Sequence, residues 1–465
     1  MKDKKKIIVF LIAVVVFFII YLQKPTEALS KSGLTCLAVL IFAIILWVCQ
    51  VFPEHCTALL MSSLFVIFKA AKVGTAFASF STESWWVVAA AVIIGAYGSR
   101  SGFLKRVALY ILKAFSPTFG GQTAALLIAG AIFQPAIPSS TTKICLLAPL
   151  GSAIGTELKY EKGSRGMNGL FCAAAVGANL LIPCFLTASY LSGQLIGYFE
   201  EAEAAKYTFG HWFALAWVWG VVVIVLSYII IRLLYSPKEK TRLGKDYIQE
   251  QISALGSMSH DEKVVAFVII MCVILWSTNS LHHIAASSIA VLGVAILCMT
   301  GVSTKETFRS YVPWDVLIMY GCIMSVAEVV SSTGVSAWIS GLLGDSLSAM
   351  VGNPFIYVAA LAVITYIVRF GLLSLGASVA ILYIIFSPIG IAAGIHPFVT
   401  GFTIICSVNV WNLYYTNGIM IAGHVSAGDG VVSYSGVQKY MWSYMLISIL
   451  GLWASIPLWQ HMGLL

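Results

Sequence analysis

The sequence predicts an all-α polytopic membrane protein, and three observations support this prediction. The 465 residues are 60% apolar and only 10% charged, whereas a soluble domain carries about 25% charged residues. Apolar runs long enough to cross a bilayer recur along the chain. Two polar, proline-interrupted stretches break these runs at corresponding places in the two halves. Irregular backbone at membrane depth is tolerated where it is buried in protein or lines a cavity.

We expect about eleven transmembrane helices and two re-entrant helical hairpins. The hairpins are predicted at 121–155 and 354–395, where Gly, Pro and Ser interrupt apolar sequence that is long enough to enter and leave on one face. The spans are predicted at 7–22, 33–52, 56–72, 84–98, 167–196, 212–235, 264–280, 284–301, 313–331, 398–425 and 440–461.

The basic residues predict the orientation. With a cytoplasmic N-terminus and re-entrant hairpins, twenty of the 27 Lys and Arg residues fall on the inside and five on the outside. This bias agrees with the positive-inside rule, and spanning hairpins would destroy it. The protein is therefore expected in the plasma (cell inner) membrane, and its net charge of +8 reflects topology, with no implication of nucleic-acid binding.

The two halves predict an inverted-topology repeat. Each contains an apolar segment ending near a glycine, a surface stretch, a hairpin and another long apolar segment. We expect scaffold helices at 1–83, a first repeat at 84–211, central helices at 212–312 with a cytoplasmic linker at 236–263, and a second repeat at 313–465. Paired interruptions in two such halves indicate the substrate site of a secondary transporter.

A run of four hydroxyl side chains predicts the first half of that site. Ser139-Ser140-Thr141-Thr142 follows Pro138, and Pro149 comes ten residues after Ser139. The second hairpin has Gly376-Ala377-Ser378, with Pro388 ten residues after the serine. Hydroxyls, backbone amides and helix N-termini bind anions, and hydroxyl and carbonyl oxygens coordinate Na⁺. The alternative is close helix packing through small residues.

Three charged residues lie in predicted membrane segments. Lys143 follows the hydroxyl run and is expected either to pair with an anion, to replace a coupling cation, or to extend toward an aqueous face. Arg369, near the start of the second hairpin, is expected nearer an interface. Glu328 is interpreted either as a proton relay or as a glutamate that pairs within the bundle or lies near a helix end.

Two predicted spans contain unusually many polar residues. We expect an unwound middle facing the cavity in both. The polar residues are Asn409, Asn412, Tyr414, Tyr415, Thr416 and Asn417 in the second half, and Asn179, Thr187, Ser189 and Tyr190 in the first.

These elements, in this order, resemble the divalent anion:sodium symporter family of di- and tricarboxylate transporters. The resemblance runs through most of the chain from about residue 33, and includes SGFLKRVAL at 101–109, YVPWDV at 311–316 and GIHP at 394–397. It implies eleven membrane helices and two hairpins per protomer. It also implies a homodimer in which a substrate domain moves against a scaffold in elevator fashion.

The resemblance also implies the site residues. In the family, a Ser-Asn-Thr motif at each hairpin tip contacts the substrate carboxylate and flanks a sodium site. Here Ser140 replaces the first Asn, and Val379 and Ala380 replace the second Asn and Thr. Substrate contacts then fall on Ser139, Ser140, Thr141, Ser378, Thr187, Thr416 and Asn417. Sodium or coupling positions fall on Ser139, Ser140, Lys143, Ser374, Ala377 and Tyr415.

We therefore expect a secondary transporter of small anions, with organic di- or tricarboxylates as the first expectation and another divalent anion such as sulfate as the alternative. Sodium symport is the first expectation, because the resemblance to a family of sodium symporters outweighs the two substitutions at Val379 and Ala380. Exchange and proton coupling remain alternatives, because Lys143 could replace a sodium. An enzyme is not expected, since HExxH, GxSxG and paired intramembrane aspartates are absent. We expect no cofactor beyond sodium ions and no other metal.

Overall fold

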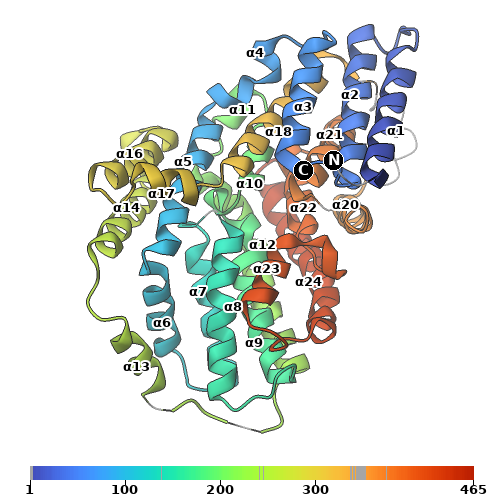
Figure 1. The fold of residues 1–465 in the computed structure, drawn as a ribbon. Coiled ribbons are helices and arrows are strands. Elements are labelled where there is room, and N and C mark those ends of the chain that lie inside the picture. The colour runs from blue at the N-terminus through green and yellow to red at the C-terminus, as the bar shows by residue number, and fades with distance from the viewer. Residues whose placement is uncertain are drawn as a thin grey trace.

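The computed structural model describes residues 4–137, 139–239, 241–244, 246–335, 338, 341, 352–372 and 374–465. Throughout this part of the chain the named elements are helices, which confirms the predicted all-α class. Figure 1 shows an elongated molecule with the amino-terminal helices at one end and the helices of the first hairpin at the other.

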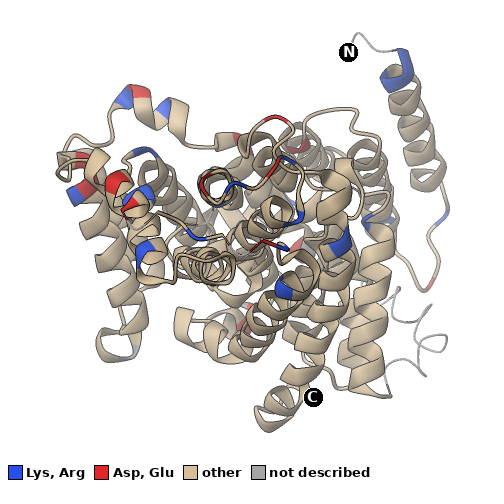
Figure 2. Cartoon of the chain, turned by 90° about the horizontal axis from the view of Figure 1, so that it is seen from below, with Lys and Arg blue, Asp and Glu red and all other residues tan. Residues whose placement is uncertain are grey.

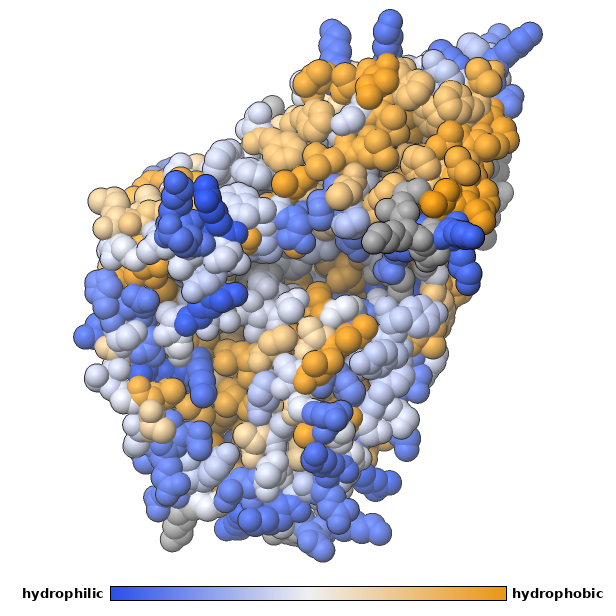
Figure 3. Space-filling view, in the orientation of Figure 1, coloured by the Kyte–Doolittle hydropathy of each residue, from blue (hydrophilic) through white to orange (hydrophobic). Residues whose placement is uncertain are grey.

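The amino-terminal bundle consists of α1 (Lys4–Tyr21), α2 (Lys31–Val48) and α3 (Glu54–Ile67), and α18 (Trp314–Ser332) packs against it. The Ser30 hydroxyl caps α2 by accepting a hydrogen bond from the Gly33 backbone N–H. One face of α1 exposes large apolar side chains, among them Leu11, Val15 and Ile19. In Figure 3 this end of the molecule is predominantly orange, as expected of a surface that faces lipid.

A second group of helices packs around α5 (Glu83–Arg100), with α14 (His260–Ser277) and α16 (Ala286–Met299) against it. After α5 the chain turns at Gly102, whose φ of +90° is a conformation that glycine adopts without strain. The following helix, α6 (Phe103–Ala114), is bent by 70° from α5.

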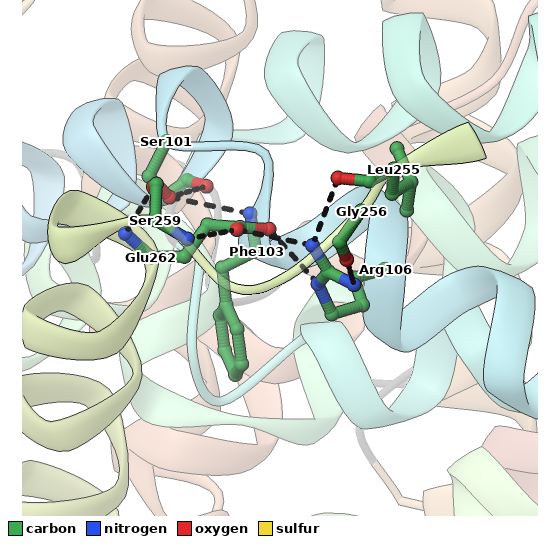
Figure 4. A network of polar contacts seen from close by, with 8 residues as sticks. Ser101, Phe103, Arg106, Leu255, Gly256, Ser259 and Glu262 are labelled. Carbon is green, nitrogen blue, oxygen red and sulfur yellow. Dashed lines mark hydrogen bonds and ion pairs between the residues drawn. The ribbon is translucent and has the colours of Figure 1, made fainter. Parts of the chain in front are cut away.

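A buried ion pair joins α6 to the start of α14 (Figure 4). Arg106 donates to both carboxylate oxygens of Glu262, at 3.0 and 3.1 Å, and to the carbonyl oxygen of Gly256 at 2.9 Å. The Glu262 carboxylate also accepts the Ser259 backbone N–H at 2.8 Å, while the Ser259 hydroxyl accepts the Glu262 N–H. The reciprocal capping box holds the Glu262 carboxylate at the start of α14, and the ion pair of that carboxylate with Arg106 ties α6 to α14.

Each predicted hairpin is a pair of helices. The first is α7 (Phe119–Phe133) and α8 (Ser140–Glu157), and the second is α20 (Pro354–Val368) and α21 (Leu375–Ala392). α8 contains Pro149 and α21 contains Pro388. Gly130 of α7 lies so close to Gly177 that a Cβ there would be 2.2 Å from the Gly177 carbonyl carbon. Glycine at both positions permits this backbone contact.

Both polar spans are broken helices, as predicted. The first consists of α9 (Arg165–Ala175), a π-helical turn η2 (Val176–Leu180), two short 3-10 turns η3 (Ile182–Cys184) and η4 (Leu186–Ala188), and α10 (Tyr190–Ile196). The second consists of α22 (Pro397–Val408), the 3-10 turn η5 (Tyr414–Thr416) and α23 (Gly418–Ser426). α9 packs against both arms of the first hairpin, and α22 packs against both arms of the second.

Two long helices, α12 (Phe209–Tyr235) and α24 (Tyr434–His461), pack against each other and against the broken helices. Trp212, Trp219 and Trp459 are fully buried there. The linker predicted at 236–263 contains one short helix, whose Ile248 and Ile252 are buried. The remaining short helices are α4 (Val73–Ala76), η1 (Ala78–Ser81), α11 (Glu201–Ala204), α13 (Tyr247–Ala254), α15 (Asn279–His282) and α17 (Lys305–Tyr311).

Every predicted span coincides with a helix or a broken helix. Within the described ranges, six helices are long and apolar enough to cross a membrane, or up to seven if α5 and α6 form one span. One of them is α21, an arm of the second hairpin. In Figure 2 most helices are tan along most of their length, and the blue and red residues lie largely on turns, on short helices and near the ends of the longer helices. The number of spans remains a prediction.

Candidate functional site

The two hairpin tips have the same local structure. In each, a serine side chain caps the second helix: Ser139 accepts from the Thr142 N–H, and Ser374 accepts from the Ala377 N–H. Alignment on these caps equates Ser139 with Ser374. The prediction that Ser139 corresponds to Ser378 is therefore wrong. It relied on proline spacing, but Pro149 lies ten residues after its cap and Pro388 fourteen residues after its own.

On the same alignment, each tip contains one cationic side chain that donates a hydrogen bond to one polar side chain. The two side chains occupy opposite positions in the two tips, because the cation lies on the second helix in one tip and at the end of the first helix in the other. In the first tip, Lys143 Nζ donates to Oε1 of Gln134, the C-cap residue of α7. In the second tip, Arg369 is the C-cap residue of α20 and donates to the Ser378 hydroxyl at 3.4 Å. Gln134 thus corresponds to Arg369, and Lys143 to Ser378.

Each cation also binds the broken helix of its own half. Lys143 Nζ donates to the carbonyl oxygen of Ala188 at 3.2 Å, and Arg369 donates to the carbonyl oxygen of Thr416. Ala188 immediately precedes the N-cap of α10, and Thr416 immediately precedes the N-cap of α23. The two halves therefore place one cation each at equivalent junctions between a hairpin tip and a half-helix.

Both cations are buried in protein. Lys143 is 0% exposed and Arg369 is 1% exposed. The alternative that Lys143 extends toward an aqueous face is therefore wrong, because its ammonium group bonds within the interior. The expectation that Arg369 lies near an interface and near the start of its hairpin is also wrong, because Arg369 lies at the hairpin tip. Glu328 is exposed on α18, close to the end of that helix.

An asparagine cluster joins the two broken helices where each is interrupted. The Asn179 side chain donates to Oδ1 of Asn409 at 3.1 Å, and the Asn409 amide donates to the Asn179 carbonyl oxygen at 2.8 Å. The Asn417 amide also donates to Asn409 Oδ1 at 3.1 Å. All three side chains are buried. Mutual hydrogen bonds satisfy these amides in an apolar interior and fix the two breaks side by side.

The predicted site residues differ in their exposure. Ser140, Thr187, Ser378, Thr416, Asn417, Ser374 and Ala377 are buried, whereas Thr141 and Tyr415 are exposed and Ser139 is half-buried. Thr187 donates its hydroxyl to the carbonyl oxygen of Pro135 at 2.8 Å, which ties the first break to the first tip. The Ser378 hydroxyl donates to the Ser374 carbonyl oxygen at 2.7 Å, so this hydroxyl is already engaged within α21.

Sequence reasoning missed Gln134, the tip position of Arg369 and the capping role of Ser374. A usable signal was present, because Gln134 and Arg369 each precede the capping serine by five residues. Within the described ranges, no three His, Cys, Asp or Glu side chains form a group that could hold a metal ion. The polar groups at the tips are hydroxyls, amides and two cations, which are suited to recognising an anion.

Comparison with known proteins identifies relatives along the whole chain. The family model described as the sodium:sulfate symporter transmembrane region matches residues 4–461. Dicarboxylate transporter 1, chloroplastic, of Spinacia oleracea is 23% identical over 97% of this chain and 80% of its own length. The sodium-dependent dicarboxylate transporter SdcS of Staphylococcus saprophyticus is 24% identical over 82% of this chain and 78% of its own length.

The fold is also similar to a solved transporter structure. The YdaH transporter of Alcanivorax borkumensis superposes with a TM-score of 0.57 at 14% identity, covering 98% of this chain and 97% of that one. At this identity the likeness concerns the fold alone.

Proposed function

The chain belongs to the sodium:sulfate symporter family, and from this premise we propose that it exchanges dicarboxylate anions across a membrane. It is a transporter and not an enzyme. The observation that carries the exchange proposal is the pair of buried cations, Lys143 and Arg369, one at each hairpin tip. Two fixed positive charges match the two carboxylates of a dianion.

The physical argument is the free energy of moving a buried charge. An uncompensated ion in a low-dielectric interior costs several kcal/mol, even after the surrounding protein relaxes. Among the described residues, no carboxylate lies within 4 Å of Lys143 Nζ. A bound anion would neutralise the ammonium group of Lys143, so the loaded site would cross the membrane more readily than the empty one. Influx of one anion then requires efflux of another.

The moving part in this proposal is the pair of hairpins with the broken helices. We propose that they form a substrate domain that slides against a scaffold containing 1–83, as in an elevator. We further propose the repeats 84–211 and 313–465, the central helices 212–312, a homodimer and a cell-membrane location with a cytoplasmic N-terminus. The repeated tip-to-half-helix contacts of Lys143 and Arg369 support the two-fold design.

Candidate substrate contacts remain the groups around the tips. Ser139, Thr141 and the N-terminus of α8 would bind one carboxylate beside Lys143. Ser374 and the N-terminus of α21 would bind the other beside Arg369. Both helices are 18 residues long, so each N-terminus carries the partial positive charge that the helix dipole produces.

Sodium-coupled symport is the second candidate. It is favoured by the family description and by the sodium-dependent dicarboxylate relative. Hydroxyls and carbonyl oxygens at Ser139, Ser140 and Ser374 would supply oxygen ligands. The charges at the tips argue against symport. The ammonium group of Lys143 lies at the first tip and the guanidinium group of Arg369 at the second, and each would repel a sodium ion.

Counterflow in proteoliposomes tests the proposal. Vesicles loaded with unlabelled succinate are expected to take up labelled succinate transiently and saturably, and external malate or 2-oxoglutarate should compete. A channel gives no counterflow. Counterflow of labelled sulfate in sulfate-loaded vesicles, with no counterflow of labelled succinate, would overturn the substrate class and leave transport of a divalent anion.

A further inference from the structure

A hydrogen bond joins the second hairpin tip to the amino-terminal bundle. The Ser374 hydroxyl, which caps α21, donates to Oε2 of Glu54 at 3.0 Å. Glu54 is the first residue of α3, and it lies 320 positions away in the sequence. Ser374 is 3% exposed, whereas Glu54 is exposed. In the described part of the chain, no other side-chain hydrogen bond connects this bundle with the second hairpin.

The place that Glu54 occupies has the chemistry of an anion site. It offers a serine hydroxyl, the N-terminus of an 18-residue helix and the nearby guanidinium of Arg369. Glu54 and Arg369 interact electrostatically, and Tyr190 and Asp315 are the other titratable groups that face them. A carboxylate of the protein thus lies against the tip that would receive a carboxylate of the substrate.

The position of Glu54 at the start of a helix does not by itself indicate a function, because acidic residues are favoured there by the helix dipole. Glu83 is a useful comparison, since it is also exposed and also the first residue of a helix, α5. No hydrogen bond or ion pair joins Glu83 to another described side chain. The contact with a hairpin tip is therefore specific to Glu54.

We propose that Glu54 is an internal competitor for the substrate carboxylate at the second hairpin tip, and that it holds the empty tip against the amino-terminal bundle. This proposal rests on the proposed function and extends it to a residue outside both repeats. Substrate arrival displaces Glu54 from Ser374 and releases the tip for movement. In the empty carrier the contact re-forms and retains the tip, which suppresses return without substrate.

The surrounding interface suits such a releasable contact. Ala377, Ala380 and Ile384 of α21 pack into the same apolar core as α2, α3 and α18. Contacts between small apolar side chains are non-directional and allow one helix to slide past another. Among the described residues, the Glu54–Ser374 hydrogen bond is the directional side-chain contact between the amino-terminal bundle and α21, so its presence or absence distinguishes the held tip from the released one.

Neutralising Glu54 tests the proposal. Glu54→Gln keeps the size and the acceptor oxygen but removes the charge, and Glu54→Ala removes both. Glu83→Gln is the matched control, with the same charge change at another helix start. Removing a like charge from beside an anion site is expected to tighten equilibrium binding of labelled succinate about tenfold or more in both Glu54 variants. Purified protein in nanodiscs, of confirmed size and thermal stability, is the material to use.

A second readout examines retention of the empty tip. Wild-type vesicles without internal substrate should take up little succinate. Glu54→Ala vesicles should take up at least severalfold more, but still less than loaded vesicles, because the buried cations continue to oppose return of the empty site. Succinate affinity that is unchanged or weaker in both Glu54 variants, with wild-type counterflow intact, would overturn this inference alone. A wild-type protein that binds neither succinate nor malate would overturn the proposed function, and the inference with it.

Discussion

Replacement of Lys143 by methionine separates a functional cation from a structural one. Methionine keeps most of the length and apolar contact of lysine but removes the charge and the ammonium donors. Lys143 is 0% exposed, and its ammonium group donates hydrogen bonds to Gln134 Oε1 and to the Ala188 carbonyl oxygen. We expect Lys143→Met to fold normally while dicarboxylate exchange is lost.

The magnitude follows from two opposing terms. Leaving a buried acceptor without its donor costs about 1–3 kcal/mol, whereas removing a buried charge recovers a desolvation penalty of several kcal/mol. Stability should therefore be preserved or raised. Loss of a hydrogen bond from a charged group to the substrate is worth about 1.5–3 kcal/mol, or about 10- to 150-fold in affinity.

The assay combines thermal unfolding in detergent with counterflow of labelled succinate. Lys105→Met is the matched control, because Lys105 is an exposed lysine on α6 and the substitution makes the same charge change. Wild-type exchange by Lys143→Met would refute the reasoning. A large fall in its Tm with normal substrate affinity would instead show that Lys143 stabilises the fold.

Three further substitutions, the first with a matched control, test the fold and the site. Gly130→Ala places a Cβ 2.2 Å from neighbouring backbone and should destabilise the protein by about 1–3 kcal/mol in thermal unfolding, whereas Gly74→Ala meets no atom within 4 Å and should be silent. Arg106→Ala leaves a buried carboxylate and should lower the Tm clearly. Hydrogen bonds from Arg106 and from a backbone N–H lower the pKa of Glu262, so the stability contributed by this pair is present at neutral pH. It is lost as the pH falls through that lowered pKa, and a flat acid limb of the Tm–pH curve would contradict the assignment. Thr141→Ala should weaken succinate binding by about 10- to 150-fold with an unchanged Tm, and unchanged binding would remove Thr141 from the site.

The sequence was sufficient to predict the helical class, the two hairpins and the two broken helices. Each of these follows from local composition: apolar runs of spanning length, Gly and Pro interruptions, and polar residues such as Asn179 and Asn409 within apolar segments. The register between the tips was not predictable from Pro149 and Pro388, because a proline inside a helix does not mark where that helix begins.

The partners of the site residues could not be predicted from local sequence. Lys143 and Arg369 lie at different positions within their hairpins, and only the folded tips bring each beside an equivalent carbonyl oxygen. The Glu54–Ser374 hydrogen bond spans 320 residues and depends on how two helix groups pack. Long-range contacts of this kind are a property of the tertiary structure, for which one sequence carries no direct signal.

Uptake of labelled succinate under an imposed sodium gradient tests the central claim most directly. Proteoliposomes are prepared empty or loaded with unlabelled succinate, each with and without an inward sodium gradient. If Lys143 and Arg369 act as fixed charges in place of a carried cation, uptake occurs only into loaded vesicles and is independent of sodium. Strong sodium-driven accumulation into empty vesicles would contradict exchange and establish symport.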